Sequence, residues 1–399
     1  MTRPRGAQAL HLSPDNVLNR VQRAGLMGGV VGLALCVAGL VVDREQFFHS
    51  YIIAYLFWFG IALGSLAVLM LQYLTGGRWG AVVRRILEAG SRTLPLMALL
   101  FVPLALGIPH LYHWAHADAV AHDEILRQKA LYLNVPFFLV RAVLYFAIWI
   151  TITRFLNRWS LEQDARPDPA CERRLELLSR GGIVLYVLTM TFAAIDWAMS
   201  LDPHWFSTIY GVMFIGGQGL STFAFVILVC AMLADRPPMS EILSADRFHD
   251  LGKLMLAFVI LWAYFFFSQF LIMWSGNLPE EIPFYLRRTQ GGWQYLGILL
   301  VIFHFALPFL VLLSRDIKRR ARTLAAVASV VIVFRMVDLF WQIRPFSEPE
   351  HLALHWLDLA AVVGVGGIWL WAFVGQLKGR PLVPMHDPYL PGVAEEAGI

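Results

Sequence analysis

A few ionisable side chains lie within long apolar stretches of the sequence, where they could carry protons. Asp196 and Asp338 each lie near the end of an apolar run, Arg335 precedes Asp338 by three residues, and His304 lies in the middle of another run. Burying an ionisable group in lipid is costly, so residues of this kind are functional candidates. A buried carboxylate can take up and release a proton, and a histidine can relay it. These residue types therefore point to proton chemistry.

Three further polar side chains fall within predicted helices: Arg141, Lys253 and Gln269. Together with the first four residues they form the candidate proton path. Arg335 and Asp338 would share one helical face, so they could form an ion pair. The alternative is therefore a set of buried ion pairs and hydrogen bonds that fix the register of the helices. The sequence leaves both interpretations open for Asp196 and Asp338.

Metal, haem and iron–sulfur chemistry find little support in the sequence. Three histidines end the third apolar run: His110, His113 and His116. They have no H-x-x-x-H pair with a supporting carboxylate, so we interpret them as interfacial residues rather than metal ligands. The three cysteines are isolated: Cys36, Cys171 and Cys230. His304 has no obvious histidine partner for haem, so we expect no redox cofactor or metal of the chain's own.

The elements that must position these residues are membrane helices. Of the 399 residues, 58 % are hydrophobic and only 15 % are charged, whereas soluble domains have about 25 % charged residues. A spanning helix needs about 20 apolar residues. Ten apolar runs meet that need: 24–42, 50–73, 93–114, 135–153, 181–201, 207–234, 251–274, 293–313, 323–342 and 355–374. The sequence predicts an all-α integral membrane protein, and its basic loops indicate topology rather than nucleic-acid binding.

The basic residues also predict the orientation of the chain. With the N-terminus inside, 24 of the 32 Lys and Arg residues fall in cytoplasmic segments and 6 in outer loops, while Arg141 and Arg335 lie within helices. Cytoplasmic loops of membrane proteins carry an excess of Lys and Arg. We therefore expect both termini to be cytoplasmic, which places Asp196 and Asp338 toward the outer ends of their helices.

An internal repeat predicts how the helices are grouped. A shift of 157 residues pairs Gly60 with Gly217, and a shift of 142 residues pairs Asp196 with Asp338. This pattern predicts two four-helix bundles in the same orientation, each with one aspartate at an equivalent depth. The predicted division is a cytoplasmic tail (1–23), a first helix and loop (24–49), the first bundle (50–206), the second bundle (207–345), a tenth helix (346–374) and a cytoplasmic tail (375–399).

Three long strings carry a resemblance to a known family: DWAMSLDPHWFSTIYG (Asp196–Gly211), DLGKLMLAFVILWAYFFFSQFLIMWSGNLPEEI (Asp250–Ile282) and RMVDLFW (Arg335–Trp341). Over about Val21 to Gln376 the chain resembles the ActF membrane subunit of bacterial alternative complex III. That complex is a quinol:cytochrome c (or cupredoxin) oxidoreductase. The resemblance implies an NrfD-like fold of ten helices with two four-helix bundles, located in the bacterial inner membrane.

The resemblance also implies a function and partners. The subunit would hold no redox cofactor of its own, and would provide scaffold and a proton-conducting path. Quinol would lie nearby in an ActC-like subunit, and haem c and iron–sulfur clusters in a multihaem cytochrome c and an iron–sulfur protein, with a terminal oxidase as a further partner. Two alternatives stay open: a quinol-binding NrfD-like subunit of another respiratory enzyme, and a secondary transporter, for which the sequence Gly216-Gly217-Gln218-Gly219 would be the helix break.

Overall fold

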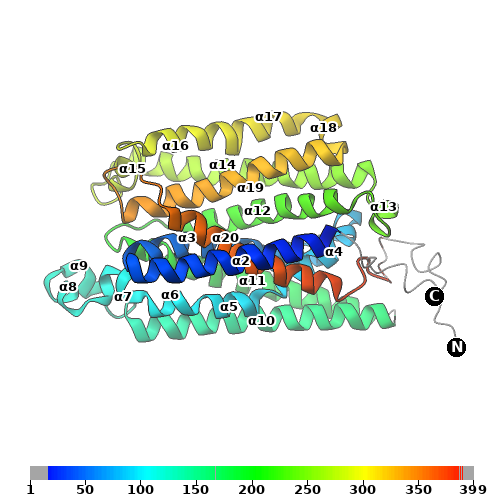
Figure 1. Cartoon of the computed structure of the whole chain (residues 1–399), viewed down its shortest axis with the longest axis horizontal. Coiled ribbons are helices and arrows are strands. Elements are labelled where there is room, and N and C mark those ends of the chain that lie inside the picture. Colours follow the sequence, from blue (N-terminus) through cyan, green and yellow to red (C-terminus); the bar gives the residue numbers. More distant parts are fainter. Residues whose placement is uncertain (1–16, 167, 386, 388, 390–399) are drawn as a thin grey trace.

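Long parallel and antiparallel helices make up the protein (Figure 1). The computed structural model describes residues 17–166, 168–385, 387 and 389. Within these residues ten helices are long and apolar enough to cross a membrane, and no β-strand is formed. The prediction of an all-α multi-pass membrane protein is therefore confirmed.

The helices of the first half follow one another with short connections. They are α2 (Val17–Val42), α3 (Arg44–Thr75), α4 (Arg78–Ser91), α5 (Leu94–Leu100), α6 (Val102–Leu106), α7 (Ile108–Leu111), η1 (His113–Ala115), α8 (Ala117–His122), α9 (Glu124–Lys129), α10 (Val135–Ala165), α11 (Pro169–Trp197) and η2 (Met199–Leu201). The spans among them are α2, α3, α4 to α6, α10, and α11 with η2.

The helices of the second half begin after the turn at residues 202–209. They are α12 (Tyr210–Leu233), α13 (Met239–Ile242), α14 (Ala245–Gly276), α15 (Pro283–Arg288), α16 (Trp293–Leu299), η3 (Leu300–Ala306), α17 (Leu307–Leu313), α18 (Arg315–Arg319), α19 (Ala321–Ile343), η4 (Arg344–Phe346) and α20 (Trp356–Lys378). The spans among them are α12, α14, α16 to α17, α19 with η4, and α20.

Several helices extend well beyond the apolar runs of the sequence. The run 135–153 predicts only part of α10, which continues to Ala165, and α11 begins 12 residues before the run 181–201. Hydropathy marks the part of a helix that lipid surrounds, whereas the backbone hydrogen bonds continue into its polar flanks. The same effect makes residues 17–23 of the predicted N-terminal tail helical. The tail residues 1–16, 386, 388 and 390–399 lie outside the described part of the chain.

The predicted bounds of the third run, 93–114, are wrong: the span begins at Arg78 with α4 and ends at Leu106 with α6, and the run itself is divided into short helices. Pro95, Pro103 and Pro109 lie in the first turns of α5, α6 and α7. Proline lacks the N–H that a continuous helix needs, but it is well suited to a first turn. The chain therefore restarts its helix at each proline and ends in the His113–Ala115 turn instead of continuing to residue 114 as one helix.

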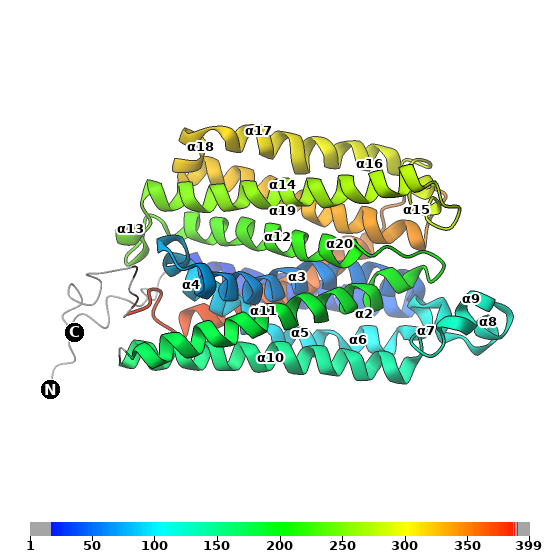
Figure 2. The same ribbon diagram turned by 180° about the vertical axis from the view of Figure 1, so that it is seen from behind.

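Helices α3 and α12 lie in the middle of the protein (Figures 1 and 2). In their most apolar stretches 89 % and 83 % of the residues are buried, compared with 22 % for α14. Helix α3 contacts α4, α11, α12 and α20, while α12 contacts α14 and α19. Helix α10 lies at one edge, and α16 and α17 lie at the other. The division into two bundle domains stays a prediction.

Helices α2 and α20 form a close pair through glycines. A Cβ atom at Gly32 would lie 2.4 Å from the backbone nitrogen of Gly364, and one at Gly367 would lie 2.3 Å from the backbone nitrogen of Gly29. Small residues of this kind let two membrane helices approach until their backbones touch. The first and last spans therefore lie side by side, and both contact α3.

The helix ends and loops at one end of the protein are rich in Lys and Arg residues in the sequence, and we call it the basic end. It contains α4, α13, α18 and the C-terminal part of α10, and lies on the right in Figure 1. Between the two ends the outer surface is apolar: Met27 is 70 % exposed and Leu310 is 64 % exposed. Apolar side chains exposed on this scale need lipid or another apolar partner around them.

Candidate functional site

Asp196 lies at the end of α11 and is fully buried. Arg141 on α10 donates two hydrogen bonds to it, from Nε to Oδ2 and from Nη2 to Oδ1, both 2.8 Å long. The hydroxyl of Tyr145, one turn further along α10, donates to Oδ2 at 2.9 Å. A two-pronged arginine contact of this kind is one of the strongest that a carboxylate makes. It fixes α10 to α11.

The other side of the Arg141 guanidinium is also occupied. Its Cζ atom lies 3.9 Å from the centre of the Tyr132 ring and 4.4 Å from that of Phe137, and its Nη1 donates to the Tyr132 carbonyl at 2.9 Å. Arginine is well suited to such a position because its planar group can stack and pair at once. The Arg141 guanidinium therefore has both a hydrogen-bonded carboxylate and stacked aromatic rings as neighbours.

Asp338 is the counterpart of Asp196 in the second half, and it is fully buried as well. Arg335, on the same helix α19, forms the ion pair that the three-residue spacing predicts. Trp262 Nε1 on α14 donates to Asp338 Oδ2 at 3.1 Å, and Gln342 Nε2 donates to Oδ1 at 2.9 Å. Only Trp262 among these partners comes from another helix.

Helix α12 makes room for the second ion pair. A Cβ atom at Gly217 would lie 2.2 Å from the Cζ atom of Arg335, so only glycine leaves space for the guanidinium. Helix α12 is continuous from Tyr210 to Leu233, so the glycines at 216–219 do not break it. Their role is close packing, which the sequence left as an alternative to the helix break of a transporter.

His304 has open hydrogen-bonding capacity. It is fully buried, and neither Nδ1 nor Nε2 has a partner. Its ring meets the Trp262 ring edge to face, with centroids 4.6 Å apart. The backbone around it is a π-helix, η3, in which the N–H of Leu307 donates to the carbonyl of Ile302. Wide turns of this kind often occur at functional sites.

The two remaining predicted residues, Gln269 and Lys253, lie in different surroundings. Gln269 on α14 is buried, and neither its amide nitrogen nor its amide oxygen has a partner. Lys253 lies at the basic end of α14, where its side chain is 53 % exposed and pairs with Asp250 at 3.0 Å. Its long side chain reaches the polar flank, as lysines near helix ends do. The structure therefore does not bring Lys253 to the buried groups.

We call Trp262, His304, Arg335, Asp338 and Gln342 the inner cluster. An aromatic groove with a volume of about 740 Å³ lies beside it, between α14 and the span of α16, η3 and α17. Its lining is almost wholly apolar: Ile260, Trp262, Ala263, Tyr264, Phe266, Phe267, Phe270, Tyr285, Gly297, Val301, Phe305, Phe309 and Trp341. Trp262 belongs to both, so it connects the groove to Asp338.

Arg288 lies next to the inner cluster, on the side of the end opposite the basic end. It is buried and donates from Nε to the Trp341 carbonyl at 3.0 Å and also to the Gln342 carbonyl, while its Cζ lies 3.5 Å from the centre of the Phe284 ring. Burial lowers the pKa of Arg288 to about 9, because desolvation penalises its charge. It still has its charge at neutral pH.

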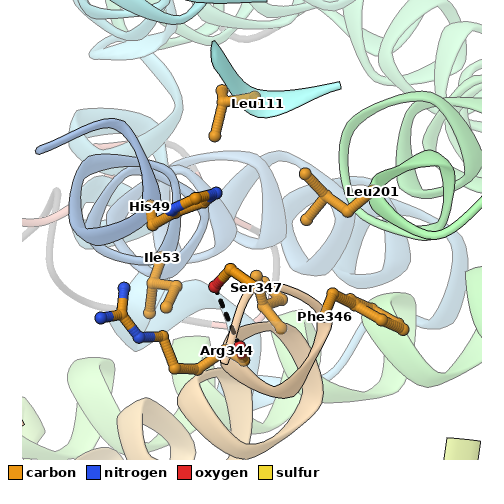
Figure 3. A pocket seen from close by; sticks show the side chains of 8 residues that line it. His49, Ile53, Leu111, Leu201, Arg344, Phe346 and Ser347 are labelled. Carbon is orange, nitrogen blue, oxygen red and sulfur yellow. Dashed lines mark hydrogen bonds between the residues drawn. The ribbon is translucent and has the colours of Figure 1, made fainter. Parts of the chain in front are cut away.

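A small pocket of about 40 Å³ lies at the same end, where α3, α7, η2 and η4 meet (Figure 3). His49 and Arg344 lie on opposite sides of it. The guanidinium of Arg344 contacts Gln46 and Glu348, but its Nε and Nη1 have no partner. The pocket is large enough for about one water molecule.

Sequence reasoning missed several residues of these sites. Tyr145 and Gln342 could have been found, because each follows a candidate, Arg141 or Asp338, by four residues and so shares its helical face. Trp262 gives no such signal, since it reaches Asp338 across 76 positions of sequence. The pairing of Arg141 with Asp196 was also missed, because their contact joins two different helices.

The three histidines of the third run do not gather. The ring of His110 stacks on Phe48 with centroids 5.3 Å apart, and His116 Nε2 lies 2.8 Å from the Pro109 carbonyl. In the described part of the chain no group of three or more His, Cys, Asp or Glu side chains could hold a metal ion. No protein-family model matches the chain, and a search of curated proteins gives no match either.

Proposed function

We propose that the chain is a membrane subunit of a respiratory quinol:cytochrome c (or cupredoxin) oxidoreductase of the alternative complex III type, and that it conducts protons. The observation that carries the proton role is the inner cluster. It places a buried ion pair, Arg335–Asp338, next to His304, whose two ring nitrogens are without partners. Ionisable groups buried in a membrane span are costly and mark proton relays in membrane proteins.

The residues of the inner cluster would have different tasks. A neutral imidazole has one nitrogen with a proton and one with a free lone pair, so His304 can accept a proton and pass one on. Asp338 can take up a proton when the contact with Arg335 loosens. Trp262 orients both, because it donates to Asp338 and contacts the His304 ring. Gln342 and Arg288 continue the polar groups toward the end opposite the basic end.

The other side of the path is less polar. Gln218 accepts a hydrogen bond from the Tyr186 hydroxyl at 2.7 Å, and Ser221 donates to the Gly217 carbonyl at 2.9 Å. Lys253 lies beyond them at the surface of the basic end. A proton crossing this stretch would need ordered water or a rearrangement of α12 against α19.

The two aspartates have unequal parts in this proposal. Asp196 accepts three hydrogen bonds from Arg141 and Tyr145 on the neighbouring helix, so we assign it to holding α10 and α11 together. Proton conduction is assigned to the second half alone. In the bacterial inner membrane the basic end would face the cytoplasm. An ActC-like subunit would oxidise quinol, and its electrons would pass to an iron–sulfur protein and a multihaem cytochrome c.

One observation favours a second candidate function, the binding of quinol by this chain. The aromatic groove beside the inner cluster is large and apolar, as sites for flat organic molecules are, and Trp262 connects it to Asp338. A quinol in the groove would release its protons close to His304. The two candidate functions predict different effects of substitutions in the inner cluster on the rate of electron transfer.

The experiment is to replace His304 by Gln and Asp338 by Asn, singly, in the assembled complex. Quinol:cytochrome c turnover and proton release are measured together in proteoliposomes. If the chain conducts protons, turnover continues and proton release per electron falls in both variants. Loss of turnover in a complex that assembles would favour the quinol-binding role. Unchanged turnover and unchanged proton release would contradict both candidates and leave the chain a scaffold.

A further inference from the structure

A second large cavity lies at the basic end, away from the inner cluster. It has a volume of about 530 Å³ and lies between α5, the C-terminal part of α10 and the segment after α20. Its lining combines arginines with apolar and small polar side chains: Arg92, Pro95, Ile150, Thr153, Arg154, Asn157, Arg158, Leu161, Glu162, Ala165 and Arg380. Four arginines and one glutamate give this cavity a clear excess of positive charge.

Two of the arginines are held in place by neighbouring groups. Arg380 Nη1 donates to Asn157 Oδ1 at 2.9 Å and contacts Glu88 at 3.3 Å. Arg92 Nη2 donates to the Gln376 carbonyl at 2.5 Å, and its buried Nε has no partner. Glu88 is shared, because Arg85 also pairs with it. Asp164 pairs with Arg85 as well, so two carboxylates stand against the three guanidinium groups of Arg85, Arg92 and Arg380, and one positive charge is left uncompensated.

The other two arginines lie on the exposed face of α10. Arg158 pairs with Glu162 one turn later at 2.8 Å, with 73 % of its side chain exposed. Arg154 is exposed, and the described residues provide no hydrogen-bond or ion-pair partner for its side chain. Exposed ion pairs along a helix contribute little. Arg154 and Arg158 are therefore both available to an anion that enters the cavity.

The apolar part of the cavity continues toward the middle of the membrane spans. Pro95 on α5 is exposed, and Ile150 on α10 lies one turn before Arg154. The cavity therefore has arginines toward the helix ends and apolar side chains toward the lipid interior. A phospholipid matches this arrangement, because it has a charged head group at one end and apolar acyl chains at the other.

We propose that this cavity binds an acidic phospholipid, with the phosphate held by Arg92, Arg154, Arg158 and Arg380 and an acyl chain along Pro95 and Ile150. Basic pockets between membrane helices are suited to anionic head groups. The planar guanidinium group binds phosphate through paired hydrogen bonds. The bound lipid would connect α5, α10 and the segment after α20.

The experiment uses the purified full chain in detergent and follows its thermal unfolding while lipid is added. The probes are phosphatidylglycerol, phosphatidylcholine and inorganic phosphate. The test variant is Arg154→Gln with Arg158→Gln, and the charge-matched control is Arg315→Gln with Arg322→Gln, two exposed arginines at the same end but outside the cavity. Each arginine near an anionic lipid changes affinity by about fivefold, so the test variant should bind phosphatidylglycerol about 25-fold more weakly.

The expected result is a rise in unfolding temperature with phosphatidylglycerol for the wild type and the control, at about the same lipid concentration. Phosphatidylcholine and inorganic phosphate should give no comparable rise. An equal rise with phosphatidylcholine would overturn charge recognition, and an equal rise with inorganic phosphate would overturn the lipid as the ligand. An affinity unchanged in the test variant, or reduced equally in the control, would overturn the cavity as the site.

Discussion

At the residue scale, the two buried aspartates differ in the origin of their partners. Asp196 receives all of its side-chain hydrogen bonds from Arg141 and Tyr145 on the neighbouring helix α10. Asp338 receives most of its partners from its own helix α19. A pair between helices contributes to how the helices are held, whereas a pair within one helix leaves the helix free to adjust. This difference favours a structural role for Asp196 and a functional one for Asp338.

The first prediction concerns the Arg141–Asp196 pair. Replacing Asp196 by Asn leaves the buried Arg141 guanidinium without a counter-charge, and removing one partner of a buried pair costs about 3–5 kcal/mol. We expect a large fall in the unfolding temperature of the purified protein in detergent. The double variant Arg141→Gln with Asp196→Asn should recover part of the loss, because no charge is left unpaired. A single variant as stable as the wild type would contradict the prediction.

The second prediction concerns the space that Gly217 leaves for Arg335. In Gly217→Ala the new Cβ would overlap the guanidinium, whose nearest atom lies 2.2 Å away, so Arg335 must move away from Asp338. Overpacking of this kind costs about 1–3 kcal/mol. The matched control is Gly60→Ala, whose Cβ would lie 3.5 Å from Gln218 Cγ, an ordinary contact. Equal unfolding temperatures for the two variants would show that Arg335 does not depend on Gly217.

At the element scale, the contact of α2 with α20 depends on single glycines. The α2 positions Gly28 and Gly32 are one turn apart, but they face different surroundings. A Cβ at Gly32 would lie 2.4 Å from the backbone of Gly364, whereas one at Gly28 would lie 3.5 Å from the end of the Val363 side chain. Backbone atoms cannot move aside as a side chain can, so only the first position requires glycine.

The third prediction follows from that difference. Gly32→Ala should separate α2 from α20, which lowers the unfolding temperature and makes the contact surface of the two helices accessible to protease. Gly28→Ala should change neither the unfolding temperature nor the protease sensitivity. Limited proteolysis of the purified protein measures whether α2 detaches. If Gly32→Ala resists proteolysis and unfolds like Gly28→Ala, the close approach of the two helices does not limit stability.

The same scale shows what hydropathy can and cannot predict. Each of the ten apolar runs overlaps one of the ten spans, because lipid imposes a length and a composition on each, although the third span begins at Arg78 rather than at residue 93. They do not reveal the breaks before Pro103 and Pro109, since proline is as apolar as its neighbours, nor the π-helix around His304. Contacts between helices, such as Arg141 with Asp196, depend on how helices are rotated against each other. A single sequence contains little information on that rotation.

At the scale of the whole molecule, the halves are joined mainly along α3 and α12, and polar contacts reinforce the join at the end opposite the basic end. Ser50 on α3 donates to Asp358 on α20 at 2.6 Å, and Arg344 in η4 donates to Gln46 on α3. The charges at the two ends differ, and that asymmetry is the basis for the proposed orientation. The orientation decides which side of the membrane the inner cluster faces.

The fourth prediction tests that orientation with single cysteines. The three native cysteines are all buried, so they should react little with a membrane-impermeant maleimide. Leu131, 89 % exposed, lies before α10 at the end opposite the basic end, and Ser240 is exposed on α13 at the basic end. If the basic end is cytoplasmic, Leu131→Cys should be labelled in spheroplasts, and Ser240→Cys only after the membrane is permeabilised. The reverse labelling pattern would show that the protein has the opposite orientation in the membrane. The side with Gln342 and Arg288 would then be the cytoplasmic entrance to the inner cluster. Labelling of both cysteines before permeabilisation would show that the membrane had been damaged, which a cytoplasmic marker enzyme measured in the same sample checks independently.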